Sequence, residues 1–257
     1  MLTRNEILRL KSLHTLKGQK NLCSVLIEGL RLVEDCLESQ WPSKQLLIVE
    51  KNLEKSQYLK IINLARSVRI QLLSISQKEM ERISDTKNPQ GIALEIHTPV
   101  EAEEISIADK ILYLDNISDP GNLGNIMRTA VWFGVEQILL SENCVNIWNP
   151  KVVRSAMGAH FKIDCDIFNL DELLWEHPDI PHKVFGAYME GNSLAEINVN
   201  NSQWILVLGN EARGISQKLN GLINQRITIE GSGFQESLNV SVAGGIILHH
   251  LNKENIS

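Results

Sequence analysis

The sequence predicts an α/β protein of two domains. Short apolar runs of strand length alternate with amphipathic stretches of helical spacing along all 257 residues. An acidic stretch over 98–108, with Pro99 near its start, separates the two halves and is typical of a linker. Strands of the second half end in loops rich in glycine and amide side chains, where open α/β sheets bind ligands. We therefore expect one domain over 1–97 and another over 109–257.

The first half contains four predicted strands. Ser76 followed by Glu79 is the signature of a capped helix start, and the last apolar run ends the domain near His97. In order, we expect a helix over 1–20, a strand over 23–27, a helix over 28–37, a strand over 46–49, a helix over 58–65, a strand over 70–73, a short helix from Ser76 and a strand over 91–96.

The second half repeats the alternation with more glycine at strand ends. Pro120 supplies turn chemistry, Leu123 and Ile126 then recur at helical spacing, and Gly134 ends the helix. The predicted strands cover 111–114, 136–140, 184–188, 204–208 and 226–230, and the predicted helices cover 122–133, 150–157, 170–175, 215–222 and 237–252.

Composition places the protein among ordinary globular chains. The N-terminus is interrupted by charge every few residues and no later apolar run is long enough to span a bilayer, so we expect a cytoplasmic protein without a membrane partner. The cysteines are widely spaced and lack CxxC spacing, which favours buried reduced thiols over a disulfide or a zinc site. They are Cys23, Cys36, Cys144 and Cys165.

Charge is distributed unevenly along the chain. A formal net charge of −6 argues against a protein that coats nucleic acid indiscriminately. Two local stretches are basic, namely Arg4, Arg9, Lys11, Lys17 and Lys20 in the first, and Lys151, Arg154, His160 and Lys162 in the second. Such stretches fit phosphate contacts and fit solvated helix faces equally well.

The stretch 119–130 has the pattern of a ligand site. A tight turn leads into a helix N-terminus, whose exposed backbone N–H groups attract anions. Asn122, Asn125 and Arg128 lie off the apolar face of the predicted helix. Because a guanidinium is always charged, this combination suits a ligand that carries phosphate.

Two later strands also end in polar loops. The apolar run 204–208 delivers Gly209, Asn210 and Glu211 to the carboxyl edge of the predicted sheet. The Glu211 carboxylate suits hydrogen bonding to a ribose, and it equally suits the N-terminus of the following helix.

The last predicted strand ends at Glu230 and leads into a glycine loop. A helix is expected near Ser237, whose hydroxyl is a natural N-cap. The run Gly231-Ser232-Gly233 matches a dinucleotide fingerprint only weakly, because Glu236 stands where the third glycine belongs and the strand lies at the end of the fold. This counts against a nucleotide-dependent oxidoreductase.

Taken together, the three segments resemble motifs 1, 2 and 3 of the SpoU (TrmH) family of RNA 2′-O-ribose methyltransferases. The segments are 119–130, 206–211 and 236–243, in the family's order, with Arg128 six positions after Asn122. The resemblance spans most of 109–251. Residues 20–37 also resemble the ribosomal-protein-like substrate-binding domain that is common at the N-terminus of this family.

The resemblance implies a SPOUT α/β knot, in which the C-terminal chain forms a deep trefoil knot around an S-adenosylmethionine pocket. It implies a homodimer that needs no metal and acts on RNA, with ribosomal RNA favoured over transfer RNA and no role for DNA. A non-catalytic RNA-binding or ribosome-assembly protein on the same scaffold is the alternative. The family's residue set argues against it, because a protein that only binds does not need the whole set.

Site residues follow from the resemblance, position by position. The cofactor would be held by Leu208, Gly209, Asn210, Ile229 and Leu238. The central catalytic residue would be Arg128, supported by Asn122, Glu211, Ser237 and Asn239. Family accounts often make this arginine the base, but a guanidinium pKa above about 12 makes its deprotonation costly. We expect Arg128 instead to grip a phosphate and to stabilise the developing alkoxide.

One position departs from the family pattern. Many members have Ile-Pro-Met at the end of the last strand, where this chain has Ile229-Glu230-Gly231. Loss of the proline loosens the turn and places a carboxylate near the cofactor loop.

Overall fold

The computed structural model describes residues 1–99, 106–197, 203–234 and 237–252. Contacts divide the chain into two compact units. The N-terminal unit comprises 1–102 together with 148–161, and the C-terminal unit comprises 103–147 together with 162–257. The segment 148–161, which the sequence placed in the second domain, thus groups with the first unit. The functional boundaries of the two domains stay a prediction.

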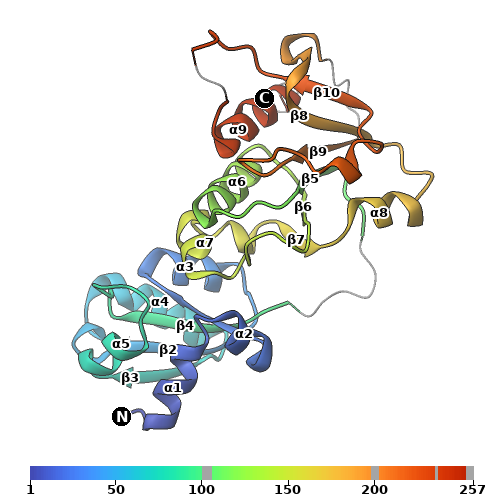
Figure 1. The fold of residues 1–257 in the computed structure, drawn as a ribbon. Helices are drawn as coiled ribbons and strands as arrows, with labels where there is room; N and C mark the ends of the chain where they lie inside the picture. The colour runs from blue at the N-terminus through green and yellow to red at the C-terminus, as the bar shows by residue number, and fades with distance from the viewer. Residues whose placement is uncertain (100–105, 198–202, 235–236, 253–257) are drawn as a thin grey trace. The chain divides into compact units, whose positions relative to one another are not determined.

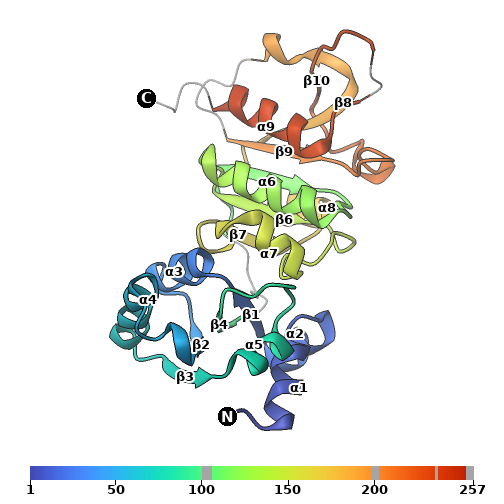
Figure 2. The same cartoon turned by 90° about the vertical axis from the view of Figure 1, so that its left-hand side faces the viewer.

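The N-terminal unit is built on a mixed four-stranded sheet in the order β1-β4-β2-β3. Strand β4 runs antiparallel to β1 and β2, whereas β2 and β3 are parallel. Helices cover both faces of the sheet (Figures 1 and 2). The elements are α1 Arg4–Ser12, α2 Leu16–Leu22, β1 Ser24–Glu28, α3 Leu30–Glu38, β2 Ser43–Val49, α4 Ser56–Ser67, β3 Gln71–Ile75, α5 Gln77–Ile83 and β4 Ile92–His97.

Most predicted elements of this unit are confirmed, including the capped start of α5 at Ser76. The single helix predicted over 1–20 is wrong, because the chain turns between α1 and α2. Thr15 starts the second helix by accepting a hydrogen bond from the Gly18 backbone N–H at 3.2 Å. Gly18 is required there, since a Cβ would stand 2.1 Å from the Ser12 carbonyl oxygen.

The C-terminal unit contains a six-stranded sheet in the order β10-β8-β9-β5-β6-β7. All neighbouring strands are parallel, so their carboxyl ends lie at one edge. Outside 148–161, the elements are β5 Lys110–Leu114, α6 Pro120–Trp132, β6 Gln137–Leu140, β7 Asp164–Ile167, α8 Leu170–Glu176, β8 Lys183–Ser193, β9 Trp204–Leu208, β10 Gln225–Thr228 and α9 Val240–Leu251. The segment 148–161 contributes α7 Pro150–Ala156.

The two faces of this sheet carry different helices. Val207 belongs to a buried cluster that includes Leu170 and Leu173 of α8. Leu208 points to the opposite face, as alternation along a strand requires, and meets α9 at Gly244. Helices α6 and α9 lie side by side on that face (Figure 2).

Three predictions for the C-terminal half are wrong. Strand β7 was not expected, and the helix predicted over 215–222 is a single 3-10 turn over Gln217–Leu219. The last helix begins at Val240, with Asn239 and not Ser237 as its N-cap. Within the described ranges, none of the helices is both long and apolar enough to cross a membrane.

Candidate functional site

Three motif residues meet at the carboxyl edge of the parallel sheet. Asn122, in the first turn of α6, donates from Nδ2 to Glu211 Oε1 at 2.8 Å. Its Oδ1 accepts a hydrogen bond from Asn239 Nδ2 at 2.9 Å. The pairs are separated by 89 and 117 positions in sequence, so only the fold brings them together. Flipping the Asn122 amide would set its oxygen against the carboxylate, so this network fixes its orientation.

Asp119 sets the start of α6. Its Oδ1 accepts a hydrogen bond from the Asn122 backbone N–H at 2.8 Å, and Pro120 occupies the first helical turn. Both features are standard helix-start chemistry. The predicted turn and helix are confirmed, and Asn122 is thereby held by its backbone as well as by its side chain.

Asn239 sets the start of α9. Its Oδ1 accepts from the Ser241 backbone N–H at 2.9 Å and from Ser241 Oγ at 2.6 Å. The remaining amide group is then free to donate to Asn122. Serine and asparagine are comparable N-caps, and the bond to Asn122 explains why Asn239 takes the role here. Ser237 is exposed and makes no hydrogen bond within the described part of the chain.

Arg128 lies on α6, about 9 Å along the helix axis from Asn122 at 1.5 Å per residue. Its side chain is exposed. Among the residues that the structure describes, the Arg128 guanidinium forms no hydrogen bond and no ion pair. It is therefore available to an anionic ligand.

Glu211 projects from a tight turn that follows β9. Asn210 and Gly214 exchange backbone hydrogen bonds of 3.0 and 2.8 Å, which closes the turn. Gly209 is required beside it, because a Cβ there would lie 2.2 Å from the Gly214 carbonyl carbon. The interpretation of Glu211 as a helix N-terminal charge is wrong, since the turn is followed only by the 3-10 turn.

Four of the predicted cofactor residues lie at or directly after the ends of two strands, and the fifth, Leu238, lies just before α9. Leu208 closes β9 with Gly209 and Asn210 behind it, and Ile229 follows β10. Because these strands are parallel, the residues share one edge of the sheet, with β8 between them. Ile229 is half-buried, and Leu238 is about half exposed. Half-exposed apolar side chains beside turn backbone suit a flat heteroaromatic ring such as adenine.

The departure at Glu230 has a local explanation. Its carboxylate accepts a hydrogen bond from Ser193 at the end of β8, and this bond together with a backbone contact holds the pKa of Glu230 below its usual value. Gly231 and Gly233 have open space where a Cβ would stand. The loop therefore keeps backbone room for a ligand, although the usual proline is missing.

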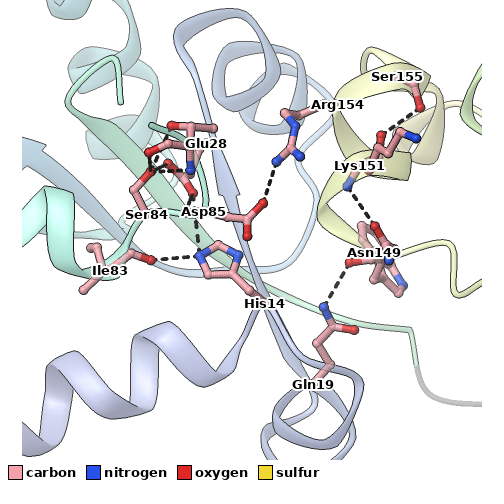
Figure 3. A network of polar contacts seen from close by, with 12 residues as sticks. His14, Gln19, Glu28, Ile83, Ser84, Asp85, Asn149, Lys151, Arg154 and Ser155 are labelled. Atoms are coloured by element: carbon pink, nitrogen blue, oxygen red, sulfur yellow. Dashed lines mark hydrogen bonds and ion pairs between the residues drawn. The ribbon is translucent and has the colours of Figure 1, made fainter. Parts of the chain in front are cut away.

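A second polar network lies within the N-terminal unit (Figure 3). Glu28 accepts hydrogen bonds from the Ser84 hydroxyl and, at 2.8 Å, from the Asp85 backbone N–H. Asp85 in turn pairs with Arg154 at 2.8 Å. Gln19 donates to the Trp148 carbonyl at 2.9 Å, so both ends of this network tie 148–161 to the unit.

These contacts change the interpretation of three residues in the two basic stretches of the sequence. Arg154 is committed to Asp85, and His160 is buried and stacks on Trp148 with 4.7 Å between ring centroids. Arg9 forms a two-pronged pair with Glu95 at 2.7 and 2.9 Å. These three residues serve the fold and not a phosphate.

Glu95 is the most deeply buried carboxylate of this unit that pairs with cations, at 1% exposure. Burial opposes its ionisation, but hydrogen bonds from Arg9 and Gln45 and the charge of Lys44 outweigh it, so its pKa lies below the usual value. The group is therefore an anion held by three partners.

Among the described residues the cysteines form no disulfide and no cluster of metal ligands. All four cysteines are free thiols, and burial raises the pKa of Cys36 to about 12. The expectation of burial is wrong for Cys23, which is exposed. Within the described ranges, no group of three or more His, Cys, Asp or Glu side chains is arranged to hold a metal ion.

Sequence reasoning missed two residues near the site. Asp119 belongs to the first motif but was not assigned a role, although its position before a Pro-Gly turn marks an N-cap. Asp115 directly follows β5 and is fully buried. A carboxylate placed immediately after an apolar strand was the available signal for it.

Comparisons with known proteins agree with this geometry. The model of the SpoU rRNA Methylase family matches residues 109–249, and a model described as RNA 2′-O ribose methyltransferase substrate binding matches 26–101. A Bacillus subtilis (strain 168) relative, 23S rRNA (guanosine(2553)-2′-O)-methyltransferase RlmP, is 31% identical over 94% of this chain and 93% of its own.

Two solved structures are similar over nearly the whole chain. A proposed RNA methyltransferase of the TrmH family from Porphyromonas gingivalis has a TM-score of 0.85 and 30% identity, covering 98% of this chain and 99% of its own. An rRNA methyltransferase from Sinorhizobium meliloti with bound AdoMet has a TM-score of 0.86 and covers 100% of this chain and 97% of its own. At 24% identity the latter establishes likeness of fold alone.

Proposed function

The chain belongs to the SpoU rRNA methylase family, and on this premise we propose that it transfers a methyl group from S-adenosylmethionine to a ribose 2′-hydroxyl of ribosomal RNA. The observation that carries the proposal is the Asn122 amide, which joins Glu211 of the second motif to Asn239 of the third. The enzyme is an RNA methyltransferase. That its substrate is ribosomal RNA is our proposal.

S-adenosylmethionine, when bound, supplies a sulfonium methyl group that is open to attack by an oxygen nucleophile. We assign its binding to Leu208, Gly209, Asn210, Ile229 and Leu238. Their place after the ends of β9 and β10 supports this assignment, together with the open backbone of the glycine loop. No metal enters the proposal.

Arg128 is the proposed catalytic residue. Its exposed guanidinium, unpaired within the described ranges, is free to grip the phosphate next to the target ribose. A fixed cation close to the 2′-oxygen also stabilises the alkoxide as it forms. Arg128 therefore acts in this scheme as an electrostatic group and not as a base, and the 2′-hydroxyl proton passes to solvent at this exposed site.

The proposed supporting residues orient the substrate side of the site. Asn122, Glu211 and Asn239 lock the first turns of α6 and α9 to the loop after β9. Such locking holds reacting groups in position, and proximity of this kind lowers barriers substantially. Ser237 remains a proposed member of this set through its place in the third motif.

Ribosomal RNA is favoured over transfer RNA by two matches. The family model and the Bacillus relative both name rRNA, and the N-terminal match is to a substrate-binding module. The alternative of a non-catalytic RNA-binding or ribosome-assembly protein is weaker. Such a protein has no use for the bridged amide network. A cytoplasmic location stays a prediction.

A homodimer and a trefoil knot complete the proposal. Trp132 of α6 is 81% exposed, and Val242 and Ile246 of α9 are 50% and 40% exposed. An apolar face of this kind on adjacent helices supports pairing with a second copy. A Cβ at Gly244 would lie 2.7 Å from a Leu208 methyl, and this close approach of α9 to β9 supports a threaded C-terminal chain.

The test is transfer of labelled methyl from S-adenosylmethionine to unmodified rRNA or tRNA, followed by alkaline hydrolysis. A 2′-O-methyl group removes the internal nucleophile, so the linkage after the modified nucleotide should survive as a labelled dinucleotide. We expect this product from rRNA. Label on a base, or no transfer to any RNA, would overturn the proposed function.

A further inference from the structure

A buried carboxylate lies directly behind the proposed active site. Asp115 follows the last residue of β5, and its side chain is 0% exposed. One carboxylate oxygen accepts from Asn116 Nδ2 and the other from the Ser216 backbone N–H, both at 2.6 Å. A buried anion is costly unless it is hydrogen-bonded in this way, so its retention needs a reason.

Hydrogen bonds connect both ends of the loop 209–216 to Asp115 and its neighbour Asn116. Ser216 is the end of the loop 209–216. At the other end, Asn210 Nδ2 donates to the Asn116 carbonyl at 2.8 Å. Asn116 itself has a left-handed backbone, with φ of 57°, and its backbone N–H donates to Ser141 Oγ at 2.9 Å. The loop is therefore fixed at its entry to Asn116 and at its exit to Asp115.

Glu211 lies between these two anchors. The turn formed by Asn210 and Gly214 positions its side chain, and its carboxylate meets Asn122 at 2.8 Å. We propose that Asp115 is a positioning residue, which holds the loop 209–216 so that Glu211 engages Asn122. This inference rests on the proposed function for its catalytic consequence, but the loop anchoring is a property of the free protein.

The geometry requires a carboxylate and not merely a polar group. Both partners of Asp115 are N–H donors, so both side-chain oxygens must accept. In Asp115→Asn the negative charge is lost and one oxygen becomes an NH₂ group, from which a rotated Asn116 amide can accept. The substitution keeps the volume and removes the charge from the bond that holds the Ser216 N–H.

The first experiment is a double-mutant cycle on kcat with Asp115→Asn and Glu211→Ala. We expect Asp115→Asn to lower kcat about tenfold, as loss of a charge-assisted hydrogen bond does, with KM for RNA nearly unchanged. Because Asp115 acts through Glu211, the double variant should be no slower than Glu211→Ala alone. Multiplicative effects would overturn the proposal.

Glu95→Gln is the matched control. This carboxylate is equally buried, at 1% exposure, and also accepts from N–H donors, those of Arg9 and Gln45, but it lies in the N-terminal unit. Its effect on kcat, if any, should multiply with that of Glu211→Ala. A loss of stability alone therefore cannot imitate the expected coupling.

Ser216→Pro gives a second variant in case Asp115→Asn folds poorly. Proline removes the N–H that Asp115 accepts, and the Ser216 φ of −62° already suits the pyrrolidine ring. It should reproduce the lowered kcat of Asp115→Asn and its lack of additivity with Glu211→Ala. Wild-type kcat in Ser216→Pro would contradict the proposal.

Hydrogen exchange separates this inference from the proposed function. Amide exchange over 209–216, measured on the free protein without RNA, should be at least about tenfold faster in Asp115→Asn than in wild type. Unchanged exchange would overturn the anchoring role even in an active enzyme. Absence of methyl transfer by wild type would overturn the function and leave the anchoring intact.

Discussion

Two polar networks of this protein, one around Glu95 and one around Asn122, differ in whether they leave a charged side chain unpaired. The Glu95 carboxylate is 1% exposed, and its negative charge is compensated by neighbours within the fold. These neighbours are Arg9, Lys44 and Gln45. Around Asn122, the partners lie at the edge of a sheet, and Arg128 is exposed further along α6. Both networks join residues far apart in sequence. The arginine that is paired, Arg9, stabilises the fold, whereas Arg128, unpaired within the described ranges, stays available to a ligand.

The largest expected effect falls on the open arginine. Arg128→Ala should lower kcat by about a hundredfold or more, since it removes a cation aimed at developing charge. Arg128→Lys should lose most activity too, because it lacks the bidentate fork. The melting temperature should hardly change. Arg154→Ala is the control, and it should keep wild-type kcat because that arginine serves Asp85. Near-normal turnover in Arg128→Lys would contradict the geometric role.

Removal of the bridging amide should be next in size. Asn122→Ala deletes one hydrogen bond to a carboxylate and one to an amide, so kcat should fall about thirtyfold. Steady-state kinetics with rRNA substrate provide the measurement. Asn125→Ala is the neighbouring control on α6, because its exposed side chain is outside the network. Equal losses in the two variants would mean that the bridge has no special role.

Substitution in the Glu95 network should instead lower stability and leave kcat unchanged. Glu95→Gln should lower the free energy of unfolding by about 2 kcal/mol, because it weakens the charge-assisted bonds from Arg9. Its kcat should stay close to wild type. Urea denaturation followed by circular dichroism would measure the first quantity. A Glu95→Gln enzyme that is fully stable but inactive would contradict the role of this network in stability.

Lowering the pH should reduce the contribution of the Glu95 carboxylate to the free energy of unfolding. The pKa of folded Glu95 lies below the ordinary value of 4.5, so its contribution is fully present above pH 4.5. It should be lost as the pH falls below 4.5 through the folded value. Between pH 7 and 3, the gap in unfolding free energy between wild type and Glu95→Gln should therefore narrow. A constant gap across this range would contradict the assignment.

The smallest expected effect concerns the lysines of α2. Lys17 and Lys20 are exposed, and replacement of both by glutamine should raise KM for RNA about threefold and flatten its salt dependence. Lys60→Gln is the control, because that lysine already pairs with Glu34 and Glu38. Filter-binding titrations at several salt concentrations would distinguish phosphate contacts from merely solvated side chains.

The sequence predicted the buried parts of the fold well. Both ends of strand β9 were predicted correctly, because Trp204–Leu208 is a continuous apolar run that is buried throughout. Strand β7 was missed because Asp164 and Asp166 alternate along an edge strand, where little apolar surface is buried. Burial leaves a signal in the local sequence, and an exposed edge leaves almost none.

The candidate site was predicted as residues but not as contacts. Asn122, Glu211 and Asn239 were named through family resemblance, yet no local pattern gives a bond between positions 89 or 117 apart. The N-cap of α9 was misplaced for the same reason. Ser237 and Asn239 are both good caps locally, and a tertiary hydrogen bond decides between them.

The grouping of 148–161 with the first unit has a consequence for synthesis of the chain. Trp148 and His160 fill a place in that unit, but they are translated about sixty residues after its last strand. At roughly 5–20 residues per second, the first hundred residues wait some 3–12 s for their final pieces. The nascent unit is thus a candidate for chaperone protection, and pulse proteolysis of stalled ribosome complexes would show when resistance appears.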